Sequence, residues 1–243
     1  MKVDVYTITY NDIKLLPYFL RHYETFADRI FAWDDGSDDG TRELLDSHPK
    51  VTVLEHNLRK LDDFYFVQHL WPQYVKSRGH ADWVICAESD EFVYHPNILE
   101  KLSELKSQKA KKVNCVGFDM YHPKFPETKG QIYDEVKLGA PDSLLSKTIV
   151  IDPEVHVKWG VGRHRCSNEK TVTFGSGIAI LHYRLLGYDY YMEKYRKHYR
   201  RARVEDLENL ELRLMITREE FETNKERCTN IVDGKDYTDY PLV

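Results

Sequence analysis

Three carboxylate side chains lie within four positions directly after an apolar run of the sequence. The run covers residues 83–85, and the acids are Glu88, Asp90 and Glu91. Like charges this close together disfavour one another's ionised form unless a positive charge lies among them. Oxygen ligands suit Mg²⁺ or Mn²⁺, which take their remaining ligands from water and a diphosphate. The spacing therefore indicates a divalent-cation site, and the alternative is a solvated turn, since Asp, Ser and Glu are common turn residues.

A second acidic turn, DDGSDDGT, occurs earlier in the chain. Its first two residues, Asp34 and Asp35, follow the predicted strand 29–33, just as the first cluster follows the predicted strand 82–87. Ligands of open α/β sheets bind outside the carboxyl ends of the strands. We therefore expect the two acidic segments to lie on the same rim of one sheet.

The elements that position these residues alternate between strands and helices in the first part of the chain. Hydrophobic periodicity predicts strands at 3–9, 29–33, 51–55 and 82–87 and helices at 12–26, 42–47 and 64–76. A helix at 97–106 and a strand at 112–122 come next, short β-like runs continue to about residue 183, and helical patterns cover 188–203 and 205–227. Strands separated by helices favour a covered parallel sheet. We therefore expect an α/β fold with a mixed second half and C-terminal helices.

The composition sets limits on domain number and partners. A chain of 243 residues, 42% of them hydrophobic, suits one substantial core, so residues 1–243 are expected to form a single domain. The net charge of -5 gives no general attraction to nucleic acid or to an anionic membrane. Without an apolar stretch near the ~20 residues of a bilayer span or a signal-peptide core, a soluble cytoplasmic protein is expected. The four cysteines form no CxxC pair, so we expect free thiols.

Five segments together resemble the GT-A glycosyltransferases. They are TITYND, FAWDDGSDDGTRELL, DWVICAESDEF, KTIVIDPEVHVKWGVGRHRC and ILHYRLLGYDYYMEKY, and they cover residues 3 to about 200. The sequence is most similar to the family-2-like group, in which DDGSxDGT is followed by xSDEF and later by an HYR segment.

The resemblance implies the GT-A fold, a Rossmann-like mixed sheet flanked by helices. Residues 1–95 would be the nucleotide-binding half, 96–187 the acceptor and catalytic half, and 188–243 a helical extension. It further implies transfer of a sugar from a nucleotide sugar, with a UDP-sugar favoured, to a glycan, lipid-linked or protein acceptor. Inversion and a Mn²⁺ or Mg²⁺ cofactor are implied in the same way.

The resemblance also assigns roles to individual residues. The residues implied in the nucleotide pocket are Thr9, Tyr10, Asn11, Asp34 and Asp35, with Gln68 reaching toward the donor. Asp90 is the expected metal ligand, and His182 is a further ligand from the second half of the chain. Glu88 and Ser89 are expected beside the ribose or the water shell of the metal, although the group usually has Asp at the position of Glu88. Glu91 would support the site or contact the acceptor.

An inverting transfer also needs a general base near the acceptor hydroxyl. Asp142 and His164 are the expected candidates, with His164 in a Gly-rich loop that would form one wall of the sugar pocket. Asp119 and Glu169 stay open, because spacing does not choose among the carboxylates. The Glu-Asp helix motif of many relatives is not visible. The alternative function is therefore a catalytically degenerate domain that binds a nucleotide sugar or glycan without turnover.

Residues 194–203 concentrate six basic side chains on one predicted helix, interleaved with Tyr195 and Tyr199. Such a stretch suits a diphosphate or an anionic acceptor, including lipid-carrier phosphates in peripheral membrane contact, or single-stranded nucleic acid. The pattern favours another interpretation, a solvated helix whose tyrosines pack inward, with Arg196 or Lys197 facing the donor phosphates as the next choice. The negative net charge and the lack of nucleic-acid-binding motifs argue against nucleic acid.

Overall fold

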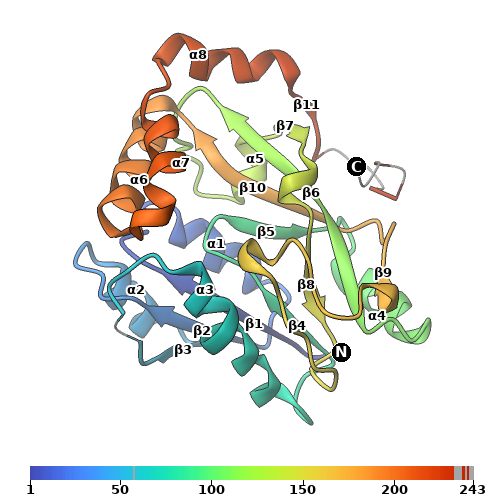
Figure 1. Cartoon of the computed structure of the whole chain (residues 1–243). Helices are drawn as coiled ribbons and strands as arrows, with labels where there is room; N and C mark the ends of the chain where they lie inside the picture. The colour runs from blue at the N-terminus through green and yellow to red at the C-terminus, as the bar shows by residue number, and fades with distance from the viewer. Residues whose placement is uncertain (57, 233–236, 239, 241–243) are drawn as a thin grey trace.

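The computed structural model describes residues 1–56, 58–232, 237–238 and 240. Its sheet runs in the order β11-β7-β6-β8-β4-β1-β2-β3, while β9 and β10 pair with β6, and β5 pairs with β10 (Figure 1). The strands are β1 (Val3–Thr9), β2 (Arg29–Asp34), β3 (Val51–Leu54), β4 (Trp83–Cys86), β5 (Glu91–Tyr94), β6 (Lys112–His122), β7 (Leu138–Pro141), β8 (Lys147–Ile151), β9 (Val172–Thr173), β10 (Ala179–Leu186) and β11 (Thr229–Asn230).

The α-helices are α1 (Leu16–Tyr23), α2 (Thr41–Ser47), α3 (Asp63–Tyr65), α4 (Ile98–Ser107), α5 (Ile132–Glu135), α6 (Tyr188–Arg201), α7 (Leu207–Leu214) and α8 (Arg218–Glu222). Shorter or irregular turns are η1 (Phe66–Leu70), η2 (Trp71–Ser77), η3 (Ser143–Leu145), η4 (Val161–Arg163), η5 (Glu169–Thr171), η6 (Val204–Asp206) and η7 (Thr223–Arg227). Among the described residues, none of the helices combines the length and the apolar composition needed to cross a bilayer.

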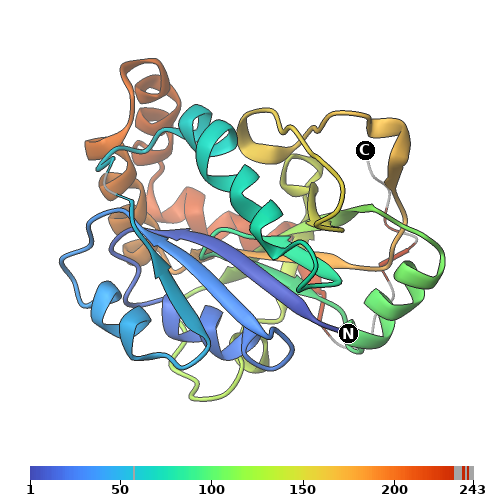
Figure 2. The ribbon, with the colours of Figure 1, turned by 90° about the horizontal axis from the view of Figure 1, so that it is seen from below.

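The first half forms the predicted parallel sheet. Strands β3, β2, β1 and β4 lie side by side and run parallel. Their side chains alternate between two layers: Val3 and Val5 pack with α1, whereas Tyr6 packs with η1 and η2. Figure 2 shows these turns, in teal, on one side of the blue strands and α1 and α2 on the other. Both faces are therefore covered, as parallel sheets require.

The helix predicted at 64–76 is instead three short segments of different pitch, α3, η1 and η2. Pro72 lies in the first turn of η2. Proline has no N–H to donate and its ring clashes with the preceding turn, so an α-helix does not continue through it unchanged.

The second half is mixed, as expected. β8 pairs antiparallel with both β4 and β6, while β10 lies antiparallel to β5 and parallel to β6. Phe92 on β5 is fully buried and packs edge-on against Phe19 of α1 and Tyr183 of β10. One core therefore extends across both halves. The predicted α/β class, a mixed sheet flanked by helices with further helices at the C-terminal end, is confirmed.

α6 begins directly after β10, where Gly187 adopts a φ of 83° that other residues rarely accept. Tyr191 and Tyr195 are buried and pack with Phe221 of α8 and Tyr121 of β6. The expected inward packing is confirmed for Tyr195, and Tyr199 is half-buried against the same cluster.

Candidate functional site

A cavity of about 350 Å³ opens at the carboxyl ends of β1 and β4. Of the residues predicted from the sequence, those that line it are Thr9, Tyr10, Asp35, Glu88, Ser89 and Asp90. Three further lining residues, Lys194, His198 and Arg201, come from α6. The cavity therefore joins both acidic segments to the basic helix.

The strand register explains why the two acidic segments meet. Thr9, the last residue of β1, lies opposite Asp34 of β2, and the carbonyl of Thr9 accepts a 3.0 Å hydrogen bond from the Asp35 amide. On the other side of β1, the Ala87 amide donates to the Tyr6 carbonyl at 3.0 Å. The segments that follow β2 and β4 therefore leave the sheet at the same edge, which confirms the predicted common rim.

Asp90 is the most strongly paired acid of the cavity. Its Oδ2 atom accepts hydrogen bonds from Nε2 of His182, at 3.0 Å, and from the buried ammonium of Lys194. Burial alone would raise the pKa of Asp90, but the charges of His182 and Lys194 outweigh it and hold that pKa well below its usual range. His182 itself reaches this position because β10 pairs with β5, one residue beyond Asp90.

The other two acids of the cluster are held by Arg163, which is fully buried. Its NH2 group donates to Glu88 Oε1 at 2.6 Å and to Glu91 Oε2 at 2.9 Å, and its guanidinium lies 4.2 Å from the ring centre of Trp71. Lys147 donates to the second oxygen of Glu91 at 2.5 Å. Glu91 is buried beneath the rim and does not line the cavity, so it supports the site through these ion pairs.

Asp35 is also fully engaged. It accepts from the Arg59 amide at 2.7 Å and from the guanidinium of Arg201, and Nε2 of His56 lies 3.4 Å away. The same guanidinium stacks 3.5 Å from the ring centre of Tyr10. Asp35 and Tyr10 together therefore fix the position of Arg201 at the wall of the cavity.

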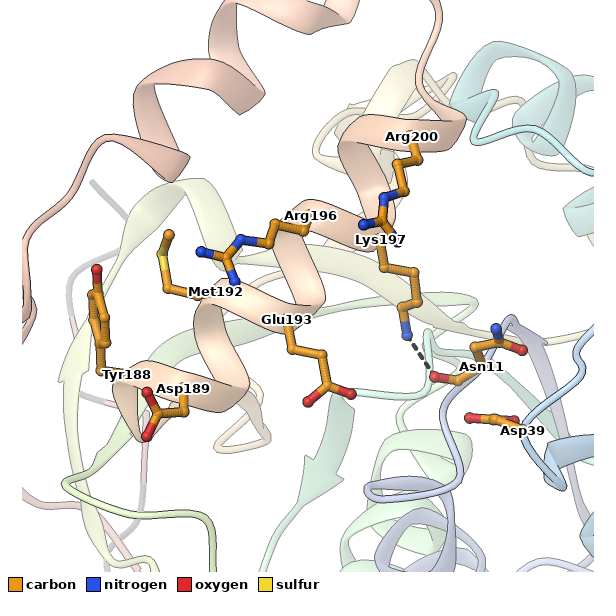
Figure 3. A pocket seen from close by; sticks show the side chains of 9 residues that line it. All are labelled: Asn11, Asp39, Tyr188, Asp189, Met192, Glu193, Arg196, Lys197 and Arg200. Atoms are coloured by element: carbon orange, nitrogen blue, oxygen red, sulfur yellow. Dashed lines mark hydrogen bonds between the residues drawn. The ribbon is translucent and has the colours of Figure 1, made fainter.

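Asp12 joins the end of β1 to α6. Ser89 Oγ donates to its Oδ2 at 2.6 Å, and Lys197 donates to its Oδ1 at 2.8 Å and to the Asn11 carbonyl at 2.7 Å. Figure 3 shows the Lys197–Asn11 contact at the edge of an outer groove, which Arg196 and Arg200 also line. Asn11 has a φ of 50°, a conformation that Asn tolerates better than most residues.

The inner face of α6 corrects the interpretation of a solvated basic helix. Lys194, His198 and Arg201 follow the i, i+4, i+7 spacing of one helix face, and all three line the cavity. Lys194 is 8% exposed, and burial together with the charges of Lys194 and Lys197 lowers the pKa of His198 to about 3. His198 is therefore neutral at physiological pH, whereas its two neighbours on this face are cationic.

A second opening lies next to the cavity, and Asp63 lines both. His164, a predicted base, lines the second opening together with Asn209 and Arg213. Asp63 accepts a 2.6 Å hydrogen bond from the Gly162 amide, and burial and the nearby Glu88 charge raise the pKa of Asp63. The sequence interpretation missed Asp63, because it lies outside both acidic motifs.

The remaining predicted residues lie away from the cavity wall. Asp34 is buried in its turn and accepts from the Ser37 amide at 3.3 Å, and Gln68 is exposed on η1. Asp142 accepts from the Leu144 amide at 2.9 Å and lies 3.7 Å from Arg184, which forms a two-point ion pair with Asp119. The structure does not describe the side chain of Glu169.

The side chains around Asp90 can be compared with the ligands that a divalent cation needs. In the part of the chain that the structure describes, no three His, Cys, Asp or Glu side chains are grouped so as to hold a metal ion. Asp90 and His182 are in contact, but Lys194 bonds to the same carboxylate oxygen. As these side chains lie, they do not fit a divalent cation, and the positive charge at Asp90 comes from the protein itself.

Comparison with known proteins found no matching family model and no matching curated protein. Among solved structures, the chain is similar to S. aureus TarS residues 1–349, with 13% identity over 92% of this chain and 71% of that chain and a TM-score of 0.44. For the same fragment in complex with UDP the identity is 14% and the TM-score 0.44, again over 92% and 71% of the two chains. A similarity of this size does not define a function, which rests on the site itself.

Proposed function

We propose that the protein is a glycosyltransferase that moves a sugar from a nucleotide-sugar donor, with a UDP-sugar favoured, to an acceptor hydroxyl with inversion. The observation that carries the proposal is the cavity at the carboxyl ends of β1 and β4, which brings the DDGS turn and the ESDEF segment together. Ligand sites of open α/β sheets occupy this position. The acceptor would be a glycan, a lipid-linked molecule or a protein.

Within this proposal the cavity binds the donor. Thr9, Tyr10 and Asp35 lie on the wall nearest β1, where the nucleoside would bind. The mechanism implied by the resemblance also contains a Mn²⁺ or Mg²⁺ ion that supplies Lewis-acid stabilisation to the departing diphosphate. Because Asp90 and His182 as they lie do not fit that ion, no step of the mechanism is routed through it.

The acceptor would enter through the second opening, because Asp63 lines both spaces. A carboxylate at this junction can take the proton of an acceptor hydroxyl as the sugar is transferred. A raised pKa makes the Asp63 carboxylate a stronger base than an exposed one. His164 lines the same opening and is the second candidate, whereas Asp142 would have to reach the reacting atoms from outside the cavity wall.

The experiment is a panel of nucleotide sugars incubated with the purified protein, with donor hydrolysis and transfer followed by chromatography. Hydrolysis of one donor by the wild-type protein and its loss in the Asp63→Asn variant would support the proposal. An Arg200→Met variant is the matched control, because Arg200 is exposed and lines the outer groove. If nucleotide sugars bind tightly but neither hydrolysis nor transfer occurs, the binding domain without turnover is the better conclusion. If none binds, both are wrong.

A further inference from the structure

The inner face of α6 carries two cations that face the cavity and have donor capacity to spare. Lys194 has three N–H groups, and its hydrogen bond within the protein goes to Asp90. Arg201 donates through one NH2 group to Asp35, and among the described residues its buried Nε atom has no hydrogen-bond partner. The Arg201 side chain is 10% exposed. A buried donor without a partner at a cavity wall points to a ligand that accepts from it.

Both cations are held in place before any ligand arrives. Asp90 positions the Lys194 ammonium, and Asp35 and the Tyr10 ring position the Arg201 guanidinium. The spacing of residues 194 and 201 puts the two cations two turns apart on one helix face. His198, the residue between them on that face, is neutral. The two α-carbons are about 10 Å apart, and both side chains line the same cavity, so together they offer positive charge to an extended anion such as a diphosphate.

We infer that Lys194 and Arg201 bind the diphosphate of the donor directly, and that this binding needs no divalent cation. The inference rests on the proposed function and names which residues of the site hold the donor. A diphosphate needs positive charge and hydrogen-bond donors, and an ammonium with a guanidinium supplies both. The cluster of carboxylates is then explained by the cations that it anchors, since Asp90 and Asp35 each hold one of them.

The first test uses the wild-type protein. Binding of UDP, with GDP and dTDP beside it, is measured by titration calorimetry in excess EDTA and again with Mn²⁺. We expect one of these diphosphates to bind in EDTA with an affinity within about threefold of that in Mn²⁺, and to bind at least about tenfold more tightly than its own nucleoside. Binding of Mn²⁺ alone, followed by its electron paramagnetic resonance signal, is expected to be undetectable at the protein concentration used.

The second test uses a Lys194→Met variant, with Arg200→Met as its control on the outer side of the same helix. Lys194→Met should weaken diphosphate binding by at least about tenfold while leaving binding of the nucleoside unchanged, because the nucleoside carries no phosphate. Arg200→Met should change neither. A purely structural role for Lys194 would weaken both ligands together, and that result would overturn the inference. If Lys194→Met does not fold, Arg201→Met is measured in the same way.

The outcomes separate the inference from the proposed function. A diphosphate that binds with Mn²⁺ but not in EDTA overturns the inference and leaves the glycosyltransferase proposal standing. A protein that binds no nucleoside diphosphate under either condition overturns both.

Discussion

The contact between Lys194 and Asp90 makes a quantitative prediction for the Lys194→Met variant. The two side chains are 8% and 7% exposed, so both charges lie in a poorly solvated environment. Met keeps the length of the side chain and removes its charge. In the part of the chain that the structure describes, the Asp90 carboxylate then keeps His182 as its side-chain partner. Removing one member of a buried ion pair costs about 3–5 kcal/mol. For a chain of this length that is a fall in melting temperature of roughly 6–20 °C.

The measurement is urea unfolding followed by circular dichroism at pH 7.5 for four proteins. They are the wild type, Lys194→Met, Asp90→Asn and the double variant. Because the cost of each single variant comes from the unpaired buried charge that it leaves, the double variant should recover most of it and lie within about 2 kcal/mol of the wild type. Lys14→Met is the control, since Lys14 forms an exposed ion pair with Glu193 that should contribute about 1 kcal/mol or less. If Lys194→Met costs no more than Lys14→Met, or if the two single losses add in the double variant, the reasoning is refuted.

Three other predictions follow from particular residues. Asp63→Asn should lower the transfer rate by about 10²–10⁴-fold. It should also remove the low-pH limb of the profile of transfer rate against pH, because wild-type activity is lost as pH falls through the raised pKa of Asp63. A variant with the wild-type rate would exclude Asp63 as the base. Burial lowers the pKa of His22 to about 4, below the value near 6.5 of the unfolded chain, so its contribution of about 3 kcal/mol to the free energy of unfolding is present above pH 6.5 and is lost as pH falls toward 4. In the His22→Gln variant the free energy of unfolding should depend less steeply on pH in this range, and a slope equal to that of the wild type would contradict this. A Cβ at Gly117 would lie 2.2 Å from the carbonyl carbon of Leu145, so Gly117→Ala should cost about 1–3 kcal/mol or more in urea unfolding, whereas Gly160→Ala should cost much less.

The sequence predicts the parallel half of the fold well, because the apolar residues that mark each strand in the sequence are also the ones that bury it in the sheet. Alternation of apolar side chains identifies β1 and β2, and parallel strands necessarily end at one edge, so the sequence alone places Asp35 and Asp90 on one rim. The sequence does not predict the irregular pitch from Asp63 to Ser77. Hydrophobic periodicity there is close to helical, and it does not report the change of pitch around Pro72.

The segment GVGRHRC shows why individual site residues are harder to predict. The resemblance implies a role for His164, but the adjacent Arg163 is the residue that is buried against Glu88 and Glu91. Gly162 and Arg163 both have positive φ, 71° and 60°, and this tight turn directs Arg163 inward and leaves His164 exposed at the second opening. Residue spacing in the sequence does not report that turn. The predicted residue, His164, is therefore one position away from Arg163, the residue that is buried in the site.

The sequence shows Lys194, His198 and Arg201 at i, i+4 and i+7 spacing, yet the interpretation that it favours leaves them in solvent. In the sequence two features lie far apart: clustered carboxylates that need positive charge, and a helix rich in positive charge. The resemblance implies a metal ion as the source of positive charge for the carboxylates, and the pattern of the basic helix is also typical of a solvated helix. Joining them requires knowing that β10 passes beside β5 and that Gly187 turns the chain back over the rim, which brings residue 194 to Asp90. Because local periodicity does not specify that path, a carboxylate cluster in a sequence indicates a need for positive charge, and the fold decides whether a protein side chain already meets it.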